Sequence, residues 1–161
     1  MDLRLVFLGT AGATPTVDRG SPATLIARGG ERILVDCGEG TQRQLMRSVG
    51  LAHVDTILLT HLHGDHYLGL PGFLKTLSLA GREEPLQLFG PSGLYELLRD
   101  VERIIGRPRF PFLVEEARPG TVYEMPDYAV KAVATEHGMP GLAWCLEERT
   151  RAGMFHPEKA V

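Results

Sequence analysis

Several features are scarce in this sequence, and each scarcity removes a class of protein. Only two of the 161 residues are cysteines, Cys37 and Cys145, too few for a disulfide framework and suited to a reducing compartment. No apolar run approaches the roughly 20 residues that a membrane-spanning helix needs. The opening MDLRLVFLGTAG lacks the basic start and long apolar core of a signal peptide. We therefore expect a cytoplasmic protein without a membrane-spanning segment.

An excess of positive charge is also missing. The formal net charge is −3 at pH 7, whereas a domain that binds nucleic acid over a broad surface is normally basic. Any contact with RNA is therefore expected to be local. The sequence contains no internal repeat, low-complexity segment or linker. Its 43% apolar and 23% charged residues are ordinary for one globular domain of this length.

The order of the predicted elements indicates an α/β domain. Apolar runs bounded by turn residues predict strands at 3–10, 23–38 (a hairpin with its turn at Gly29-Gly30), 54–60, 86–90, and in FLVEEA, TVYEM, YAVKAVATE and LAWCLEE. Turns are predicted at Pro119-Gly120, Pro126-Asp127 and Pro140-Gly141. The run at 54–60 is apolar throughout, which is typical of a strand buried on both faces.

Helices are predicted between these strands. One begins with Thr41 as its N-cap and ends at Gly50, and another occupies PGFLKTLSLAG. A third follows Pro91-Ser92 and carries an apolar stripe: Leu94, Leu97, Leu98, Val101, Ile104 and Ile105. Strands that alternate with helices and then cluster at the end predict a layered domain with a mixed sheet.

The segment TILLTHLHGDHYLGLPG places four potential metal ligands within six residues: His61, His63, Asp65 and His66. Positions two apart point to nearly opposite sides of a helix, so His61 and His63 can converge only from an extended or looped backbone. The preceding strand and Gly64 favour that geometry, and sites in α/β sheets lie at the carboxyl ends of strands. Imidazole and carboxylate suit Zn²⁺, and this density of ligands favours two ions. The alternative interpretation is a histidine-rich surface turn.

The string THLHGDH resembles the signature of the metallo-β-lactamase superfamily, and its context narrows the resemblance. FLGTAGATP, ILVDCGEGTQRQL and HLHGDHYLGLPGFL together resemble the ribonuclease Z family, which removes the 3′ trailer from precursor tRNA. The superfamily needs only the aspartate of VDCG, whereas GEGTQRQL is typical of the tRNA-processing branch. The resemblance implies a four-layer αββα sandwich of two similar halves. Residues 1–161 would supply about the first half of this single domain and end near a flexible tRNA-clamping arm.

The resemblance also implies roles for individual residues. His61, His63 and His137 would bind the first zinc, and Asp65 and His66 the second. Asp65 would act as the general base beside His61, His63 and His66, and Asp36 would orient the metal ligands from beneath the site. Without the resemblance, Asp36 reads as a turn residue and His137 as a surface histidine.

The implied reaction is phosphodiester hydrolysis by a zinc-activated hydroxide, with a 3′-hydroxyl left on the tRNA and a 5′-phosphate on the trailer. The implied assembly is a homodimer in which one subunit clamps precursor tRNA for the other. Thr41, Arg43 and Arg47 in the GEGTQRQL segment are candidates for contact with phosphates. Arginines on a helix are more often a solvated face, and that interpretation stays open.

Part of the family's site has no counterpart in this sequence. The bridging aspartate, one further histidine ligand and the proton-donating histidine come from the family's second half. After His137 only His156 remains, and no suitable motif surrounds it. We therefore expect these 161 residues alone to be inactive, being a truncated or cleaved chain or one part of a longer one. The remaining half of the fold, or another chain, would cover an exposed sheet face.

Two further hypotheses remain. A related metal-dependent phosphodiesterase or arylsulfatase of the same fold would share the histidine cluster. An inactive fragment would act only as an assembly module. Cys37 and Cys145 lie in strand-like contexts and are predicted to be small core residues.

Overall fold

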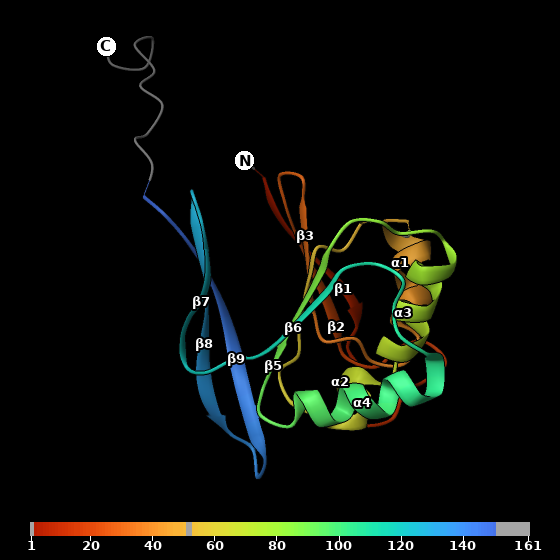
Figure 1. Cartoon of the computed structure of the whole chain (residues 1–161). Helices are drawn as coiled ribbons and strands as arrows, with labels where there is room; N and C mark the ends of the chain where they lie inside the picture. Colours follow the sequence, from red (N-terminus) through yellow and green to blue (C-terminus); the bar gives the residue numbers. More distant parts are fainter. Residues whose placement is uncertain (1, 51–52, 151–161) are drawn as a thin grey trace.

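Two β-sheets and a layer of helices make up residues 2–50 and 53–150, the part of the chain that this computed structural model describes (Figure 1). The elements are β1 (Leu3–Gly9), β2 (Ala23–Arg28), β3 (Glu31–Val35), α1 (Thr41–Ser48), β4 (Thr56–Leu58), α2 (Gly64–Tyr67), α3 (Leu70–Leu79), β5 (Leu86–Gly90), α4 (Leu94–Ile105), β6 (Phe112–Glu116), β7 (Gly120–Met125), β8 (Tyr128–Glu136) and β9 (Pro140–Glu148).

The larger sheet is mixed, as predicted, and its strands follow chain order from β1 to β6. The pairs β1–β2 and β2–β3 are antiparallel, whereas β3, β4, β5 and β6 are parallel. The predicted turn between β2 and β3 includes Gly29, whose φ of 57° a glycine adopts without strain. Because parallel strands end at the same edge, the segments that follow β3 and β4 meet there.

Helices α1, α3 and α4 cover one face of this sheet (Figure 1). β4 is buried along its whole length, as its apolar sequence predicts. The predicted stripe on α4 is confirmed for Leu94, Leu98 and Val101, which are buried in the core. The prediction is wrong for Ile104, which is 78% exposed. Ile104 lies in the last turn of α4, at the end of the helix layer.

The second sheet contains β7, β8 and β9 in antiparallel order and packs on the opposite face (Figure 1). Its buried side chains, Val130 and Leu142 among them, contact Leu58 and Phe89 of the larger sheet. The buried Arg28 on β2 also links the two sheets, because its guanidinium forms ion pairs with Asp127 at 2.9 Å and Glu148 at 3.0 Å. The described residues thus form three layers: helices, a six-stranded sheet and a three-stranded sheet.

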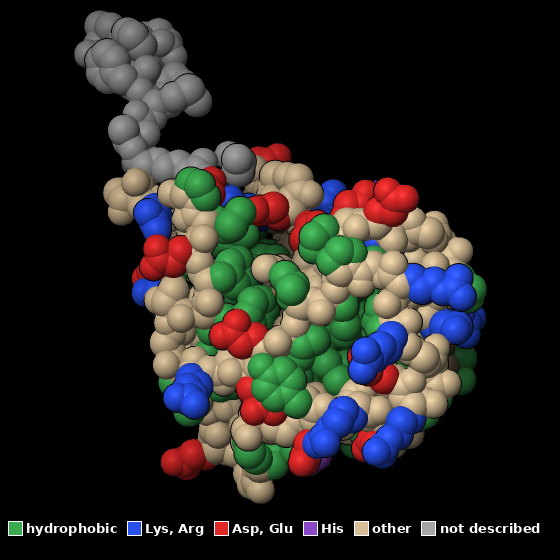
Figure 2. All heavy atoms as spheres, in the orientation of Figure 1, with side chains coloured by type: hydrophobic (Ala, Val, Ile, Leu, Met, Phe, Trp, Pro, Cys, Tyr) green, Lys and Arg blue, Asp and Glu red, His purple; other side chains and the backbone are tan. Residues whose placement is uncertain are grey.

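The second sheet leaves β1 uncovered. Leu3, Leu5 and Phe7 are 49%, 54% and 68% exposed, while Val6 and Leu8, which alternate with them, pack on the helix side. Because side chains alternate along a strand, the three exposed residues face the side of the second sheet. Because β7, β8 and β9 cover the centre of this face, its exposed apolar strip is confined to β1. Figure 2 shows further hydrophobic side chains at the surface between the two sheets.

Three local predictions are wrong. Gly40 is the N-cap of α1, with a left-handed φ of 84°, and Thr41 is the first helical residue. Pro140-Gly141 lies inside β9, and the preceding turn bends at Gly138, whose φ is 70°. Cys145 is exposed on β9 because it points away from the larger sheet, whereas Cys37 is fully buried as predicted.

Two earlier interpretations lie outside the described residues. They concern His156 and the stretch from residue 151 onward that resembles the approach to a clamping arm. Within residues 2–50 and 53–150, no helix has both the length and the apolar character needed to cross a membrane.

Candidate metal centre

Hydrogen bonds on both sides hold the segment that follows β4. Leu59 N donates to Phe89 O of β5 at 2.8 Å, and Thr60 O accepts from Leu142 N of β9 at 2.7 Å. His61 pairs with Gly141 in an isolated β-bridge. The extended backbone predicted for His61 is therefore present, and it leads from the larger sheet to the start of β9.

The second half of the histidine cluster lies on a short helix, where we expected a loop. His63 is the N-cap of α2 and has extended backbone angles, and α2 then carries Asp65 and His66. Cys37 N donates to His66 O at 2.8 Å, which fixes α2 against the segment after β3. The predicted extended or looped backbone is thus confirmed for His61 and His63, and a short helix follows it.

Glycines allow α2 to approach this segment closely. A Cβ atom at Gly38 would lie 2.2 Å from Asp65 O and 2.5 Å from Ser21 Cβ. A Cβ atom at Gly69 would lie 2.1 Å from Gly38 O. Real Cβ atoms do not approach backbone atoms so closely, so both positions require glycine. The close contact sets the position of Asp65 and His66 relative to Asp36.

Two neighbouring histidines and one from a distant part of the chain form one group. One potential ligand nitrogen from each of His61, His63 and His137 lies within 4.8 Å of the others. Their ring centroids are 4.7 Å apart for His61–His63, 4.6 Å for His61–His137 and 5.2 Å for His63–His137. His137 lies in the turn between β8 and β9, and His63 and His137 are exposed while His61 is half-buried. We call these residues the three-histidine group.

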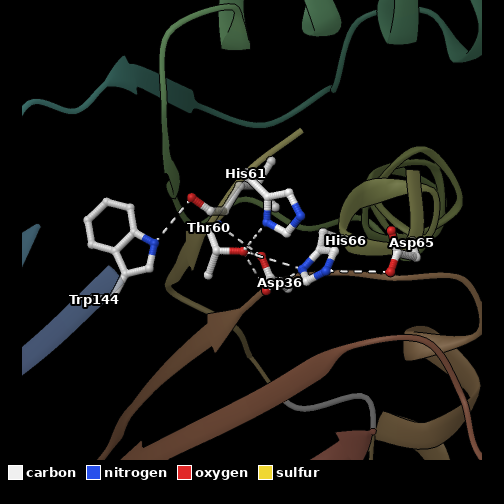
Figure 3. A network of polar contacts seen from close by, with 7 residues as sticks. Asp36, Thr60, His61, Asp65, His66 and Trp144 are labelled. Atoms are coloured by element: carbon white, nitrogen blue, oxygen red, sulfur yellow. Dashed lines mark hydrogen bonds and ion pairs between the residues drawn. The ribbon is translucent and has the colours of Figure 1, made fainter. Parts of the chain in front are cut away.

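Asp65 and His66 form an adjacent pair, which we call the Asp65–His66 pair. Asp65 Oδ2 lies 3.5 Å from His66 Nε2, and the His66 ring centroid lies 4.0 Å from that of His61. On its other side, His66 Nδ1 lies 2.8 Å from Asp36 Oδ2 (Figure 3). Asp36 is 6% exposed and has a φ of 59°, an uncommon conformation that tends to occur at functional sites.

The surroundings shift the pKa values of the two inner histidines in opposite directions. Burial by itself would lower the pKa of His66, but the hydrogen bond to Asp36 and the charges of Asp36 and Asp65 raise it above its ordinary value. Burial lowers the pKa of His61, and repulsion from His66 and His137 adds to this. As the pH falls, His66 is therefore protonated at a higher pH than His61.

Sequence reasoning missed two residues of this network, Thr60 and Trp144 (Figure 3). The Thr60 hydroxyl lies within hydrogen-bonding distance of Asp36, His61 and His66. Trp144 Nε1 on β9 donates to Leu59 O at 3.1 Å and so links the two sheets beside the cluster. A polar residue ending an apolar strand was a signal for Thr60, whereas the partner of Trp144 depends on how the sheets pack.

The candidate phosphate contacts lie on α1. The side chain of Thr41 is buried, and its hydroxyl donates to Gly38 O at 2.7 Å. Arg43 and Arg47 are exposed on the same helix. Contact between these three residues and a substrate stays a prediction.

The basic side chains visible in Figure 2 lie mostly over the helix layer. On α4, Arg99 pairs with Glu96 and Arg103 with Asp100, at 3.5 and 2.9 Å. These acidic partners offset much of the positive charge there, in agreement with the net charge of the whole chain.

The donor set fits a divalent metal ion. Three converging imidazoles, here two from residues 61–63 and one from the β8–β9 turn, are typical of zinc sites that carry out chemistry. The Asp65–His66 pair offers a carboxylate oxygen and a second imidazole beside them. Asp36 contacts the Nδ1 side of His66, which is the place that residues orienting metal ligands commonly take.

Comparison with known proteins agrees with this geometry. Residues 16–150 match the family model described as "Metallo-beta-lactamase superfamily". Proteins named Ribonuclease Z from Natronomonas pharaonis and Methanosarcina mazei are 47% and 43% identical over 99% of this chain and 53% of their own lengths. Human tRNase Z, short form, is 33% identical with a TM-score of 0.81 over 89% of this chain and 64% of that chain. This chain spans about half the length of the curated relatives it matches. It belongs to the metallo-β-lactamase superfamily.

Proposed function

We propose that this chain is part of a zinc-dependent endoribonuclease that removes the 3′ trailer from precursor tRNA. The observation that carries the proposal is the convergence of His61, His63 and His137 beside the Asp65–His66 pair. The names of relatives at 43% and 47% identity give the substrate class. The residues GEGTQRQL, typical of the tRNA-processing branch, point the same way.

Each residue of the centre has a proposed role. The three-histidine group binds one zinc, and the Asp65–His66 pair supplies two of the ligands of a second. Zinc, when bound, polarises the phosphate and lowers the pKa of water toward 7. Asp65 is the general base, and its carboxylate accepts the proton of the attacking water. Asp36 keeps His66 oriented through the 2.8 Å contact at Nδ1. The products are a tRNA with a 3′-hydroxyl and a trailer with a 5′-phosphate.

The proposal includes partners beyond this chain. Additional ligands for the second zinc come from another segment or chain, because the Asp65–His66 pair supplies only two. The same segment or chain covers Leu3, Leu5 and Phe7, since exposed apolar strips of this kind mark interaction surfaces. The working assembly is a homodimer that clamps tRNA and acts in the cytoplasm. The free thiols of Cys37 and Cys145 suit that compartment.

Cleavage of a precursor tRNA by the full-length protein tests the proposal. We expect a single cut that leaves a 3′-hydroxyl on the tRNA, loss of activity on chelation, and recovery with zinc. His63→Ala should abolish cleavage. His53→Ala, which alters an exposed histidine paired only loosely with Glu84 at 4.0 Å, should not. Zinc-dependent cleavage of a small bis-phosphodiester without cleavage of precursor tRNA would overturn the tRNA assignment and favour a related phosphodiesterase.

A further inference from the structure

Thr60 lies at the centre of the polar network in Figure 3, where its hydroxyl contacts Asp36, His61 and His66. We propose that Thr60 is a positioning residue that fixes the tautomer of His61. The Thr60 hydroxyl donates its proton to Asp36 and accepts the proton on His61 Nδ1. The His61 Nε2 lone pair is then free for a metal ion. The metal part of this inference rests on the proposed function, whereas the tautomer does not.

The contacts of Thr60 surround both its hydroxyl and its backbone. Thr60 Oγ1 lies 3.0 and 2.9 Å from the two carboxylate oxygens of Asp36, and 3.0 Å from His61 Nδ1. It also lies 3.3 Å from His66 Nδ1. Thr60 N donates to Asp36 Oδ1 at 2.8 Å, and Thr60 O accepts from Leu142 N. Both ends of the residue are thus anchored, and a β-branched side chain has few rotamers available.

Counting protons assigns a direction to each of these hydrogen bonds. An ionised carboxylate only accepts, so the single hydroxyl proton of Thr60 is donated to Asp36. With that proton used, Thr60 Oγ1 can only accept from His61, which must then carry its proton on Nδ1. The reverse arrangement, in which Thr60 donates to His61, would set a hydroxyl lone pair 2.9–3.0 Å from both oxygens of a buried carboxylate. That arrangement is unfavourable, because lone pairs of two oxygens would face each other at this distance with no proton between them.

His66 reaches the same tautomer without Thr60. Its Nδ1 lies 2.8 Å from Asp36 Oδ2 and donates to it directly. The His66 Nε2 lone pair then faces Asp65 Oδ2 at 3.5 Å, and one ion could bind both atoms. Asp36 therefore sets the tautomers of two histidines, that of His66 by direct contact and that of His61 through Thr60. His66 serves as an internal reference for any change made at Thr60.

Nitrogen NMR of the full chain, metal-free and labelled with ¹⁵N-histidine, tests the tautomer. The pH is raised until the histidine nitrogen signals stop changing, because the pKa of His66 lies above its ordinary value and only a neutral histidine has a tautomer. We expect Nδ1–H for both His61 and His66 in the unaltered protein and in Thr60→Ser, which keeps the hydroxyl. In Thr60→Val, which keeps the shape and lacks the hydroxyl, His61 should show a substantial Nε2–H fraction while His66 stays unchanged. Thr60→Ala gives the same comparison if the valine variant fails to fold.

Zinc titration of the same variants gives the second readout. Thr60→Val should weaken binding by about 10- to 100-fold, as is usual for residues that orient metal ligands, and Thr60→Ser should stay within about threefold. A His61 tautomer that is the same with and without the hydroxyl would overturn the inference, as would Nε2–H in the unaltered protein. These results do not depend on RNA cleavage. The inference can therefore fail while the proposed nuclease survives, and the nuclease can fail while the inference survives.

Discussion

The three-histidine group and the Asp65–His66 pair lie side by side but are built differently. The first gathers His61, His63 and His137 from segments more than 70 residues apart, and their ligand atoms converge within 4.8 Å. The second takes two neighbouring residues from the single turn of α2. Three protein ligands suffice for a working zinc site, whereas two do not. Within the described residues, the first half of the proposed centre therefore has the three ligands that such a site uses, and the second has two.

The two halves are also held by different contacts. The three-histidine group depends on hydrogen bonds between β9 and residues 59–61, because these bring the β8–β9 turn to His61. The Asp65–His66 pair depends on close backbone packing at Gly38 and Gly69 and on the carboxylate of Asp36. A substitution can therefore disturb one half and leave the other in place.

The largest expected effect follows removal of a histidine from the three-histidine group. His137→Ala should weaken zinc binding at the tightest site. The loss of affinity should exceed the roughly 10- to 100-fold that follows removal of a residue that only orients a ligand. His66→Ala, a matched loss from the other half, should change that site by less than about tenfold, because its three histidines remain. Zinc titration against a competing chelator measures both. Equal losses in the two variants would show that the halves form one inseparable site.

Asp36→Asn should affect both halves. Asparagine tolerates the left-handed backbone at this position, so the substitution changes the hydrogen bonding more than the fold. Its amide cannot accept from His66 Nδ1, Thr60 N and the Thr60 hydroxyl together. We expect zinc affinity to fall by about 10- to 100-fold at both sites.

The free energy of unfolding of this variant should fall by about 1–3 kcal/mol, because a buried acceptor is lost. Asp100→Asn is the control, since Asp100 is 69% exposed on α4. An effect confined to one of the two zinc sites would contradict the role of Asp36 as a shared support.

Gly38→Ala should disturb only the Asp65–His66 pair. The added Cβ would lie 2.2 Å from Asp65 O, so α2 must move or the segment after β3 must give way. Overpacking of this kind costs about 1–3 kcal/mol of unfolding free energy, which chemical denaturation measures. The His66 NMR signals should shift while those of His137 stay in place. Gly12→Ala is the control, because no atom lies within 4 Å of its added Cβ.

The smallest effect concerns the two thiols, which report how tightly α2 is packed. Burial raises the pKa of Cys37 to about 12, and the backbone of Cys37 bonds to His66 O and Gly69 N. At about pH 8, a thiol reagent should modify the exposed Cys145 rapidly and Cys37 only after unfolding, because the thiolate is the reactive form. In Cys145→Ser the exposed thiol is absent, so any modification that is measured is that of Cys37. Rapid modification of Cys37 would mean that the Asp65–His66 pair opens readily.

Much of the fold could be predicted because local patterns decide it. Alternation and apolar runs placed the strands of both sheets, and the spacing of His61 and His63 indicated an extended approach. Thr41 shows the limit of such patterns. A threonine before a helical run is a good N-cap, yet the left-handed backbone of Gly40 starts α1 and leaves the Thr41 hydroxyl to Gly38 O.

The centre itself was only partly visible in the sequence. The ligand density of HLHGDH marked one segment, but the meeting of His61 and His137 depends on how β9 docks on residues 59–61. The role of Thr60 likewise depends on the distance between two segments, and no spacing rule contains it. The position of Cys145 depends on which face of β9 turns inward. Contacts between distant segments, rather than local propensity, account for these differences.

The uncovered β1 strand has a consequence for how such a chain is made. β1 forms an edge of the six-stranded sheet and also carries the apolar side chains of Leu3, Leu5 and Phe7. An edge strand of this kind can pair with strands of other molecules. Until another segment or chain covers this strip, β1 stays exposed, and that interval is when aggregation is most probable.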